Sequence, residues 1–246
     1  LIGLRLAESI DDKKGQAELL INTGWLLMSK GDVDSSIAHF RKALEYRGLL
    51  EDDKGRASCF NMLGNAYFQK GEIEYTLDYF KKSYELRKKL GDNKGMDECL
   101  NNLGVIYYRQ TIYDSALHYL FLSIDIQKKI EAQTNKAYVG MPRTLNNIAV
   151  LYRDNKNWPE AKKYYRRSIT KSFEIRDTVS AAKFIGNLGQ TFYEEGILDS
   201  AKHYIRLAFK YNVRFKQNKS MGYNYFNLAK VYGAQQKQDS AIYFLE

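Results

Sequence analysis

Small and large apolar residues return along this chain in a fixed order, and the interval between copies is nearly constant. We take Gly64 as the reference residue of the clearest copy; the matching small residues are Gly24, Gly104, Ala149, Gly189 and Ala229. Successive reference residues are 40, 40, 45, 40 and 40 positions apart. A large apolar residue stands three positions after each reference residue and another stands sixteen after it. Two helix-length apolar segments per copy predict tandem pairs of antiparallel helices.

A short break separates the two segments of each copy. Glycine marks the predicted turn in three copies, seven positions after the reference residue: Gly31, Gly71 and Gly196. In the other three copies the residues at this position are Thr111, Lys156 and Gln236, so the sequence leaves the turn geometry there open. The second segments begin with acidic residues, and Asn157 followed by Pro159 predicts a helix cap.

These features together resemble the tetratricopeptide repeat: a small residue, an aromatic residue three later, a turn glycine, and a second small residue followed by an aromatic one. The resemblance covers essentially the entire chain. The usual repeat has about 34 residues, whereas this period is 40, which resembles a longer-helix variant of the family. The resemblance implies an all-α fold, a right-handed superhelical solenoid of antiparallel helix pairs.

We expect one solenoid over residues 15–246, with repeats at 15–54, 55–94, 95–139, 140–179, 180–219 and 220–246, the last incomplete. Residues 1–14 match the tail of a preceding incomplete repeat, and the sequence stops inside a second helix. We therefore expect a fragment of a longer protein. Five residues are added to the third repeat around 132–142, where the sequence favours a longer surface loop over a loop that folds across the groove.

The charge balance is basic, with 38 Lys and Arg residues against 29 Asp and Glu residues, for a net charge of +9. Many basic pairs fall in the second half of the second helices, where cations complement the helix dipole. This placement favours a solvated outer face over a nucleic-acid surface, so no nucleic acid is expected as a direct partner. No apolar stretch approaches the roughly 20 residues of a membrane span, so no membrane contact is expected in these residues.

The two cysteines say little about the compartment. Cys59 and Cys99 occupy the same place in adjacent repeats, and equivalent positions in stacked repeats lie too far apart for a disulfide. We expect two buried, free thiols. A cytoplasmic location is favoured over a periplasmic sensor domain, and the oligomeric state stays open.

The motifs of catalytic chemistry are missing from the sequence. It contains no phosphate-binding glycine loop, no nucleophile elbow, no zinc-ligand spacing and no set of base and nucleophile. We therefore expect neither an enzyme active site nor a cofactor or metal within these residues.

Amide side chains carry the functional hypothesis. Asparagine stands two positions before the reference residue in five of six repeats: Asn22, Asn102, Asn147, Asn187 and Asn227. A partial second row lies three positions before it: Asn61, Asn101 and Asn146. Asparagine inside a helix is less favourable than alanine by several tenths of a kcal/mol, so its recurrence points to a compensating contact. In the resembled family this face of the first helix lines the concave groove.

Two interpretations of the asparagine rows remain open. An amide offers both a donor and an acceptor, so a row of amides can bind the main chain of an extended peptide whatever its side chains. Alternatively, the asparagines bond to the backbone of the adjacent repeat and set the stacking angle. Both interpretations can hold for different residues.

The other groove positions change character along the chain. The row six before the reference residue runs from Glu18, Ser58 and Glu98 to Arg143, Lys183 and Tyr223, and the row four after it includes Tyr108, Arg153 and Tyr193. Because Arg143, Arg153 and Lys183 lie in the later half, this half is expected to favour an acidic segment or a carboxylate. The candidate peptide-binding residues are therefore the eight asparagines of the two rows, with Tyr108, Arg143, Arg153, Lys183 and Tyr193.

Three functions are compatible with this pattern. The first is a non-catalytic scaffold that binds a protein or peptide in the groove. The second is the sensory or regulatory segment of a larger signalling protein, because the array resembles those that precede kinase or DNA-binding domains in bacterial histidine kinases and transcriptional regulators. The third, an RNA-binding helical repeat, is less compatible, because paired base-reading positions do not recur.

Overall fold

Helical hairpins make up the part of the chain that the computed structural model describes, residues 12–236. No strand occurs within that range. The helices are α2 (Lys13–Ser29), α3 (Val33–Leu49), α4 (Asp53–Lys70), α5 (Ile73–Lys89), α6 (Asn93–Arg109), α7 (Tyr113–Thr134), α8 (Met141–Asp154), α9 (Trp158–Glu174), α10 (Thr178–Glu194), α11 (Leu198–Arg214) and α12 (Asn218–Ala234). The all-α fold is confirmed. Most of the predicted leading tail and the second helix of the sixth repeat lie outside the described residues.

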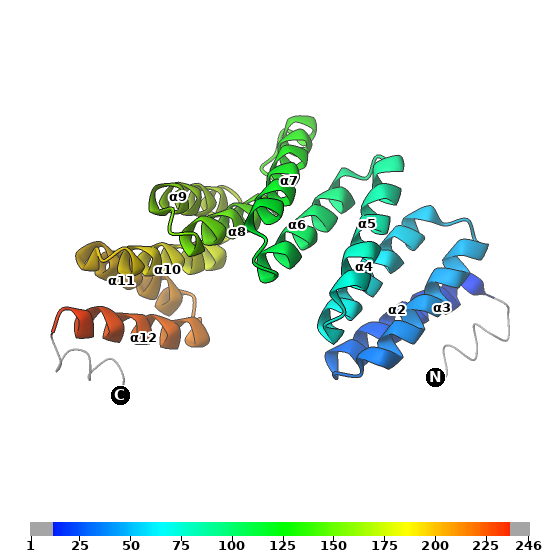
Figure 1. Cartoon of the computed structure of the whole chain (residues 1–246), viewed down its shortest axis with the longest axis horizontal. Coiled ribbons are helices and arrows are strands. Elements are labelled where there is room, and N and C mark those ends of the chain that lie inside the picture. The colour runs from blue at the N-terminus through cyan, green and yellow to red at the C-terminus, as the bar shows by residue number, and fades with distance from the viewer. Residues whose placement is uncertain (1–11, 237–246) are drawn as a thin grey trace. The chain divides into compact units, whose positions relative to one another are not determined.

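The chain divides into two compact units within α7, and the boundary lies between Ile126 and Gln127. In the N-terminal unit α2 packs on α3 and α4 packs on α5, while α3 contacts α4 and α5 contacts α6 (Figure 1). In the C-terminal unit α8 packs on α9 and α10 on α11, while α9 contacts α10 and α11 contacts α12. The second helix of one repeat therefore packs on the first helix of the next in both units.

The reference residues are small because the two helices of a hairpin approach closely there. A Cβ atom added to Gly64 would lie 2.7 Å from the ring of Phe80, and one added to Gly104 would lie 2.7 Å from Leu120. Phe80 and Leu120 stand sixteen positions after their reference residues and are each 1% exposed. The small and large residues recur in the sequence because each small residue of the first helix packs against a large residue of the second helix in the same hairpin.

Tyrosine and phenylalanine rings stack in pairs inside the hairpins. Each pair joins a residue three after the reference residue to one fifteen after it: Tyr67 with Tyr79 at 5.4 Å between centroids, Tyr107 with Tyr119 at 5.2 Å, Tyr152 with Tyr164 at 5.5 Å, and Phe192 with Tyr204 at 5.2 Å. The two rows of aromatic residues that recur in the sequence are therefore packing residues.

Aspartate caps set the starts of several first helices. Asp12, Asp52 and Asp92 accept the backbone N–H of the glycine three residues later, at 2.9, 2.8 and 3.0 Å. These helices consequently begin two residues before the repeat boundaries expected from the sequence. The predicted cap at Asn157 is present, because its side chain accepts the N–H of Glu160.

In the turn of every described repeat, one residue has a left-handed backbone conformation, whether or not that residue is glycine. The backbone φ is +86° at Gly31 and +85° at Gly71, and it is +60° at Thr111 and +55° at Lys156. The sequence left the geometry at the last two open. A β-branched side chain such as that of Thr111 is disfavoured in this conformation, so this turn stores strain.

Exchanging turn residues within the N-terminal unit should therefore change stability in opposite directions. We expect Thr111→Gly to raise the free energy of unfolding by about 0.5–1 kcal/mol, because the relief of strain exceeds the added entropy of the unfolded chain. The reciprocal Gly71→Thr should lower it by about 1–2 kcal/mol. Urea unfolding followed by circular dichroism measures both, and a Gly71→Thr variant as stable as the parent would refute this account of the turns.

The insertion in the third repeat is accompanied by a longer second helix and a longer connection after it. Helix α7 has 22 residues, whereas α5 and α9 have 17 each. The connection that follows, residues 135–140, is mostly exposed. The expected surface loop is thus only part of the insertion, and the rest continues α7.

Both cysteines are buried and free. Burial raises the pKa of the Cys59 and Cys99 thiols to about 11, so both are protonated at neutral pH. The thiol of Cys99 lies 3.2 Å from the hydroxyl of Ser83 on α5. Both thiols therefore belong to the packed interior between helices.

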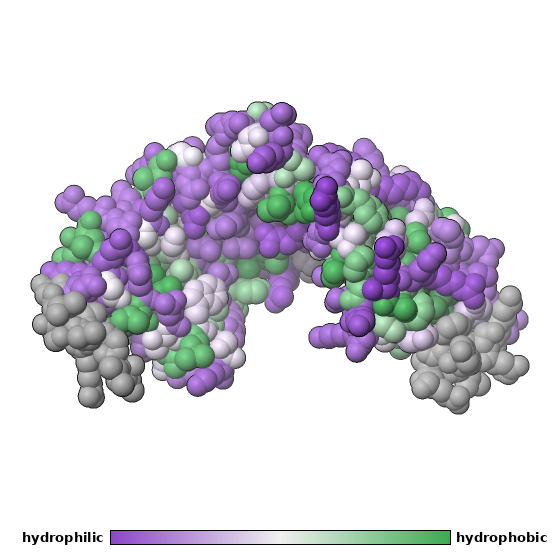
Figure 2. Space-filling model, turned by 180° about the vertical axis from the view of Figure 1, so that it is seen from behind, coloured by the Kyte–Doolittle hydropathy of each residue, from purple (hydrophilic) through white to green (hydrophobic). Residues whose placement is uncertain are grey.

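The surface that faces the viewer in Figure 2 is hydrophilic over most of its area.

Candidate functional site

Asparagine side chains from neighbouring repeats bond to one another on the face of the first helices. In the N-terminal unit, Asn102 on α6 donates its Nδ2–H to Asn61 Oδ1 on α4 at 3.3 Å. In the C-terminal unit, Asn187 on α10 donates to Asn146 Oδ1 on α8 at 2.9 Å. Each pair, which we call a rung, joins the row two before the reference residue to the row three before it in the preceding repeat. The rungs bring together four of the candidate residues.

The remaining asparagines of the two rows differ in their surroundings. Asn22 is exposed on α2, Asn101 is buried on α6, and Asn147 is half-buried on α8. Asn227 on α12 is buried, and its Oδ1 has no hydrogen-bond partner among the described residues. The rung pattern places Gly186 opposite Asn227, and glycine has no side-chain oxygen to accept a hydrogen bond from the Nδ2 of Asn227, so this rung is not formed.

The candidate aromatic and basic residues are distributed over both units. Tyr108 is half-buried on α6, with its ring 6.3 Å from that of Tyr113, and Tyr193 is half-buried on α10. Arg143 on α8 and Lys183 on α10 are exposed. Of these residues, Lys183 lines the same cavity as Asn187.

Arg153 is already paired within the chain. Its guanidinium lies 2.8 Å from Asp154 and 3.6 Å from Glu194, and its side chain is 19% exposed. Burial lowers the pKa of Arg153, whereas the nearby Tyr165, Asp154 and Glu194 raise it. Their combined effect is larger, so the pKa of Arg153 lies above its ordinary value. Because two carboxylates already lie beside Arg153, this residue is less suited to attract an acidic ligand than the exposed Lys183.

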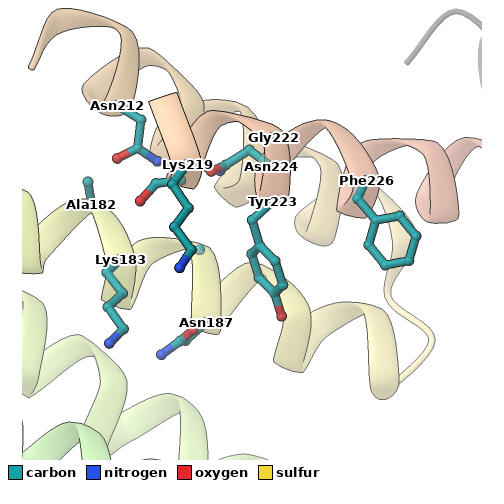
Figure 3. A pocket seen from close by; sticks show the side chains of 11 residues that line it. Ala182, Lys183, Asn187, Asn212, Lys219, Gly222, Tyr223, Asn224 and Phe226 are labelled. Carbon is teal, nitrogen blue, oxygen red and sulfur yellow. Dashed lines mark hydrogen bonds between the residues drawn. The ribbon is translucent and has the colours of Figure 1, made fainter. Parts of the chain in front are cut away.

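A cavity of about 760 Å³ opens between α10 and α12 in the C-terminal unit. Lys183, Gly186 and Asn187 from α10 line it, together with Gly222, Tyr223 and Phe226 from α12, Asn212 from α11 and other residues of α10 and α12 (Figure 3). Lys183, Asn187, Lys219 and Tyr223 extend toward the same side in this view. Two of the candidate residues from the sequence, Lys183 and Asn187, therefore line this cavity.

Two glycines make room for this cavity. A Cβ atom on Gly222 would meet nothing within 4 Å, and one on Gly186 would meet only the Cβ of Ala208 at 3.7 Å. Earlier repeats carry Asn101 or Asn146 at the position of Gly186. The absence of a side chain on both facing helices hollows this part of the groove.

Buried asparagines form the floor of the cavity. Asn212 on α11 donates to Asn224 Oδ1 on α12 at 2.9 Å, and Asn224 donates to the carbonyl oxygen of Ile205 at 3.2 Å. Sequence reasoning missed this pair, as well as Lys219, Gly186, Gly222 and Phe226. A signal was present, because the position of Asn212 carries a polar residue in the four preceding repeats as well: Arg47, Arg87, Gln127 and Ser172.

The first-helix face of the N-terminal unit differs from that of the C-terminal unit, because acidic residues on it form ion pairs with arginines of the second helices. Arg47 lies 3.7 Å from Glu18 and 2.7 Å from Asp52. Forty residues later, Arg87 lies 3.5 Å from Glu98 and 3.2 Å from Asp92. Each arginine thus links the start of a first helix to the second helix before it, and the two glutamates expected at the groove edge belong to these clusters.

Side chains suited to metal binding do not cluster anywhere in residues 12–236. Within the same residues, each helix is too short or too polar to cross a membrane. The candidate site is therefore a set of amides, aromatic rings and ammonium groups, which can hydrogen-bond and attract anions.

Solved structures with the same fold come from proteins of several kinds. A signal transduction ATPase with numerous domains (STAND) and a tetratricopeptide repeat sensor, from Pyrococcus horikoshii, matches with a TM-score of 0.79 at 18% identity over 98% of this chain and 37% of its own. BtubC from P. vanneervenii matches with a TM-score of 0.74 at 18% identity over 87% and 88% of the two chains. A Rap protein complexed with competence and sporulation factor matches with a TM-score of 0.70 at 14% identity over 94% and 73%.

Family models match most of the helical repeats directly. Models described as tetratricopeptide repeat match residues 17–48, 55–129 and 143–172, which together span more than half of the chain. No curated protein matches the sequence. With its 40-residue period, its small reference residues and its paired helices, this chain belongs to the tetratricopeptide repeat family.

Proposed function

We propose that this chain is a non-catalytic module that binds a protein or peptide segment along the face of its first helices. Tetratricopeptide repeat proteins generally act as interaction scaffolds, and the matched Rap protein was solved in complex with competence and sporulation factor. The observation that carries the proposal is the row of amides beside the cavity of the C-terminal unit. No part of the proposal requires a reacting group.

The rungs leave capacity for a ligand. An asparagine amide has two donor hydrogens and one acceptor oxygen, and the rung uses one hydrogen of Asn187 and the oxygen of Asn146. The Oδ1 of Asn187 and the Nδ2 of Asn146 are the groups that can meet a peptide bond of a ligand. The same residues can therefore fix the spacing of the repeats and present hydrogen-bonding groups in the groove.

An acidic segment is the ligand that suits the C-terminal unit. Lys183 and Lys219 line the cavity, and both are exposed. Arg143 adds an exposed cation on α8. Exposed charges steer and select partners more than they add affinity, so we expect a salt-dependent preference for acidic over neutral peptides.

Selection from a random peptide library displayed on phage, followed by fluorescence anisotropy with the purified chain, tests the proposed function. We expect enriched peptides to bind about fivefold more weakly to Asn187→Ala, because one main-chain hydrogen bond contributes about 1 kcal/mol. Asn155→Ala is the matched control, because Asn155 is exposed at the end of α8. A library that yields no binder, or an Asn187→Ala variant with unchanged affinity for every binder, would count against the proposal.

A regulatory role within a larger signalling protein is the second candidate. One observation favours it: the matched STAND protein carries its tetratricopeptide repeats as a sensor, and this chain spans 37% of that protein. In this role the same face would receive the signal. Joining the chain to a reporter kinase domain and measuring peptide-dependent activity would distinguish a sensor from a passive scaffold.

A further inference from the structure

The cavity between α10 and α12 has an interior that offers apolar surface. Its floor amides are already bonded, since Asn212 donates to Asn224 and Asn224 donates to the backbone of Ile205. The walls are the side chain of Ala182, the faces of Gly186 and Gly222, and aromatic rings of α12. An apolar group that enters the cavity gains by leaving water, because these walls are largely apolar.

The rim of the same cavity is cationic. Lys183 and Lys219 reach it from facing helices (Figure 3). The surrounding sequence reinforces this charge, because residues 200–236 contain seven Lys and Arg residues and no Asp or Glu: Lys202, Arg206, Lys210, Arg214, Lys216, Lys219 and Lys230. An anionic group at the rim is therefore attracted both by the two rim ammonium groups and by the field of α11 and α12.

We propose that this cavity binds an apolar residue followed by an acidic one in an extended peptide. The apolar side chain enters between Gly186 and Gly222, and the adjacent carboxylate pairs with Lys183 and Lys219. The volume of about 760 Å³ suits a two-residue unit, because pockets of about 300–1,000 Å³ commonly hold ligands of that size. This inference rests on the proposed function and names the motif that the C-terminal unit selects.

Consecutive residues of an extended strand point to opposite sides, which is the geometry that the proposal requires. The apolar side chain points into the cavity while the next side chain points out toward the rim lysines. Asn187 lines the same cavity as the two lysines, and in the proposed complex it bonds the peptide group that joins the two residues. A single amide therefore fixes the register of the pair.

Four labelled heptapeptides test the proposal, each acetylated and amidated, with Gly-Ser flanks and a central Phe-Glu, Phe-Gln, Ala-Glu or Ala-Gln pair. Fluorescence anisotropy with the full chain measures their affinities. We expect Phe-Glu to bind most tightly, with a loss of at least about tenfold for Ala-Glu, from lost apolar burial, and about fivefold for Phe-Gln, from two lost ion pairs.

Two variants separate the parts of the cavity. Gly222→Leu fills it and should remove the preference for Phe over Ala while keeping the preference for Glu over Gln. The double variant Lys183→Ala/Lys219→Ala should do the reverse. The matched controls are Gly48→Leu, at an open glycine of α3, and Lys54→Ala/Lys94→Ala, at the positions of α4 and α6 that correspond to Lys219. Thermal unfolding by circular dichroism confirms that each variant is folded.

Several outcomes would overturn this inference. Equal affinities for the four peptides, no binding of any of them, or a Gly222→Leu effect that is the same for Phe and Ala peptides would each do so. Tighter binding of a uridine oligonucleotide than of the Phe-Glu peptide would assign the cations to nucleic acid instead. If peptides from the random library still bind through Asn187 in these cases, the proposed function stands and only the motif is wrong.

Discussion

Replacing Phe80 by alanine is expected to lower the free energy of unfolding of this chain by about 3–5 kcal/mol. Phe80 is 1% exposed and packs with Leu103 and Ile106 of the next repeat, while its ring lies against Gly64 in its own hairpin. The substitution removes a large apolar side chain from two interfaces and leaves a cavity, since Gly64 has no side chain to fill it. Urea unfolding followed by circular dichroism measures the loss.

Leu49→Ala in the same unit is the control for Phe80→Ala. Leu49 is 67% exposed at the end of α3, so its truncation should change the free energy of unfolding by less than about 0.5 kcal/mol. A Phe80→Ala variant that loses no more stability than Leu49→Ala would show that the residue sixteen after the reference residue does not hold the hairpins together.

Leucine at two glycines of α10 should have opposite effects. At Gly189, a Cβ atom would lie 2.8 Å from the side chain of Ile205 and 3.0 Å from its backbone nitrogen, so Gly189→Leu must push α10 and α11 apart. We expect it to lower the free energy of unfolding by about 3 kcal/mol. Gly186→Leu projects into the open cavity and should be neutral or stabilising by about 0.5 kcal/mol, because leucine is the better helix former.

Calorimetric melting of the two leucine variants, side by side with the parent, provides the comparison. The two substitutions share the helix, the residue type and the gain in helix propensity, so their difference isolates the close approach at the reference residue. Similar melting temperatures for both variants would contradict this packing scheme.

The repeat period made most of the fold predictable. Because Gly64 and its equivalents recur with a large residue sixteen later, the sequence indicated helical hairpins and their contact positions. The aspartate caps were missed, although Asp52 followed by Gly55 recurs as Asp92 followed by Gly95. The left-handed turns at Thr111 and Lys156 could not be inferred from residue preference, because the packing of the adjoining helices imposes a conformation that these residues disfavour.

The sequence predicted which asparagines share a helix face, but it did not predict which of them contact one another. Sequence spacing placed Asn146 and Asn187 on the face of the first helices, but their pairing depends on the rotation between neighbouring repeats, which a period alone does not define. The cavity is lined by two residues without side chains, Gly186 on α10 and Gly222 on α12. From the sequence alone, a glycine inside a helix indicates only a lower helix propensity. Its contribution to a cavity becomes visible only when the neighbouring helix is placed.

The central claim is that the first-helix face of this chain binds the main chain of a peptide and leaves the peptide unchanged. The most direct measurement is the nuclear magnetic resonance spectrum of the asparagine side-chain amides during titration with a peptide selected from the random library. We predict that the signals of Asn146 and Asn187 shift while those of Asn155 and Asn157 stay in place, and that the peptide is recovered intact. Shifts confined to residues of the second helices, or recovery of a cleaved peptide, would contradict the claim.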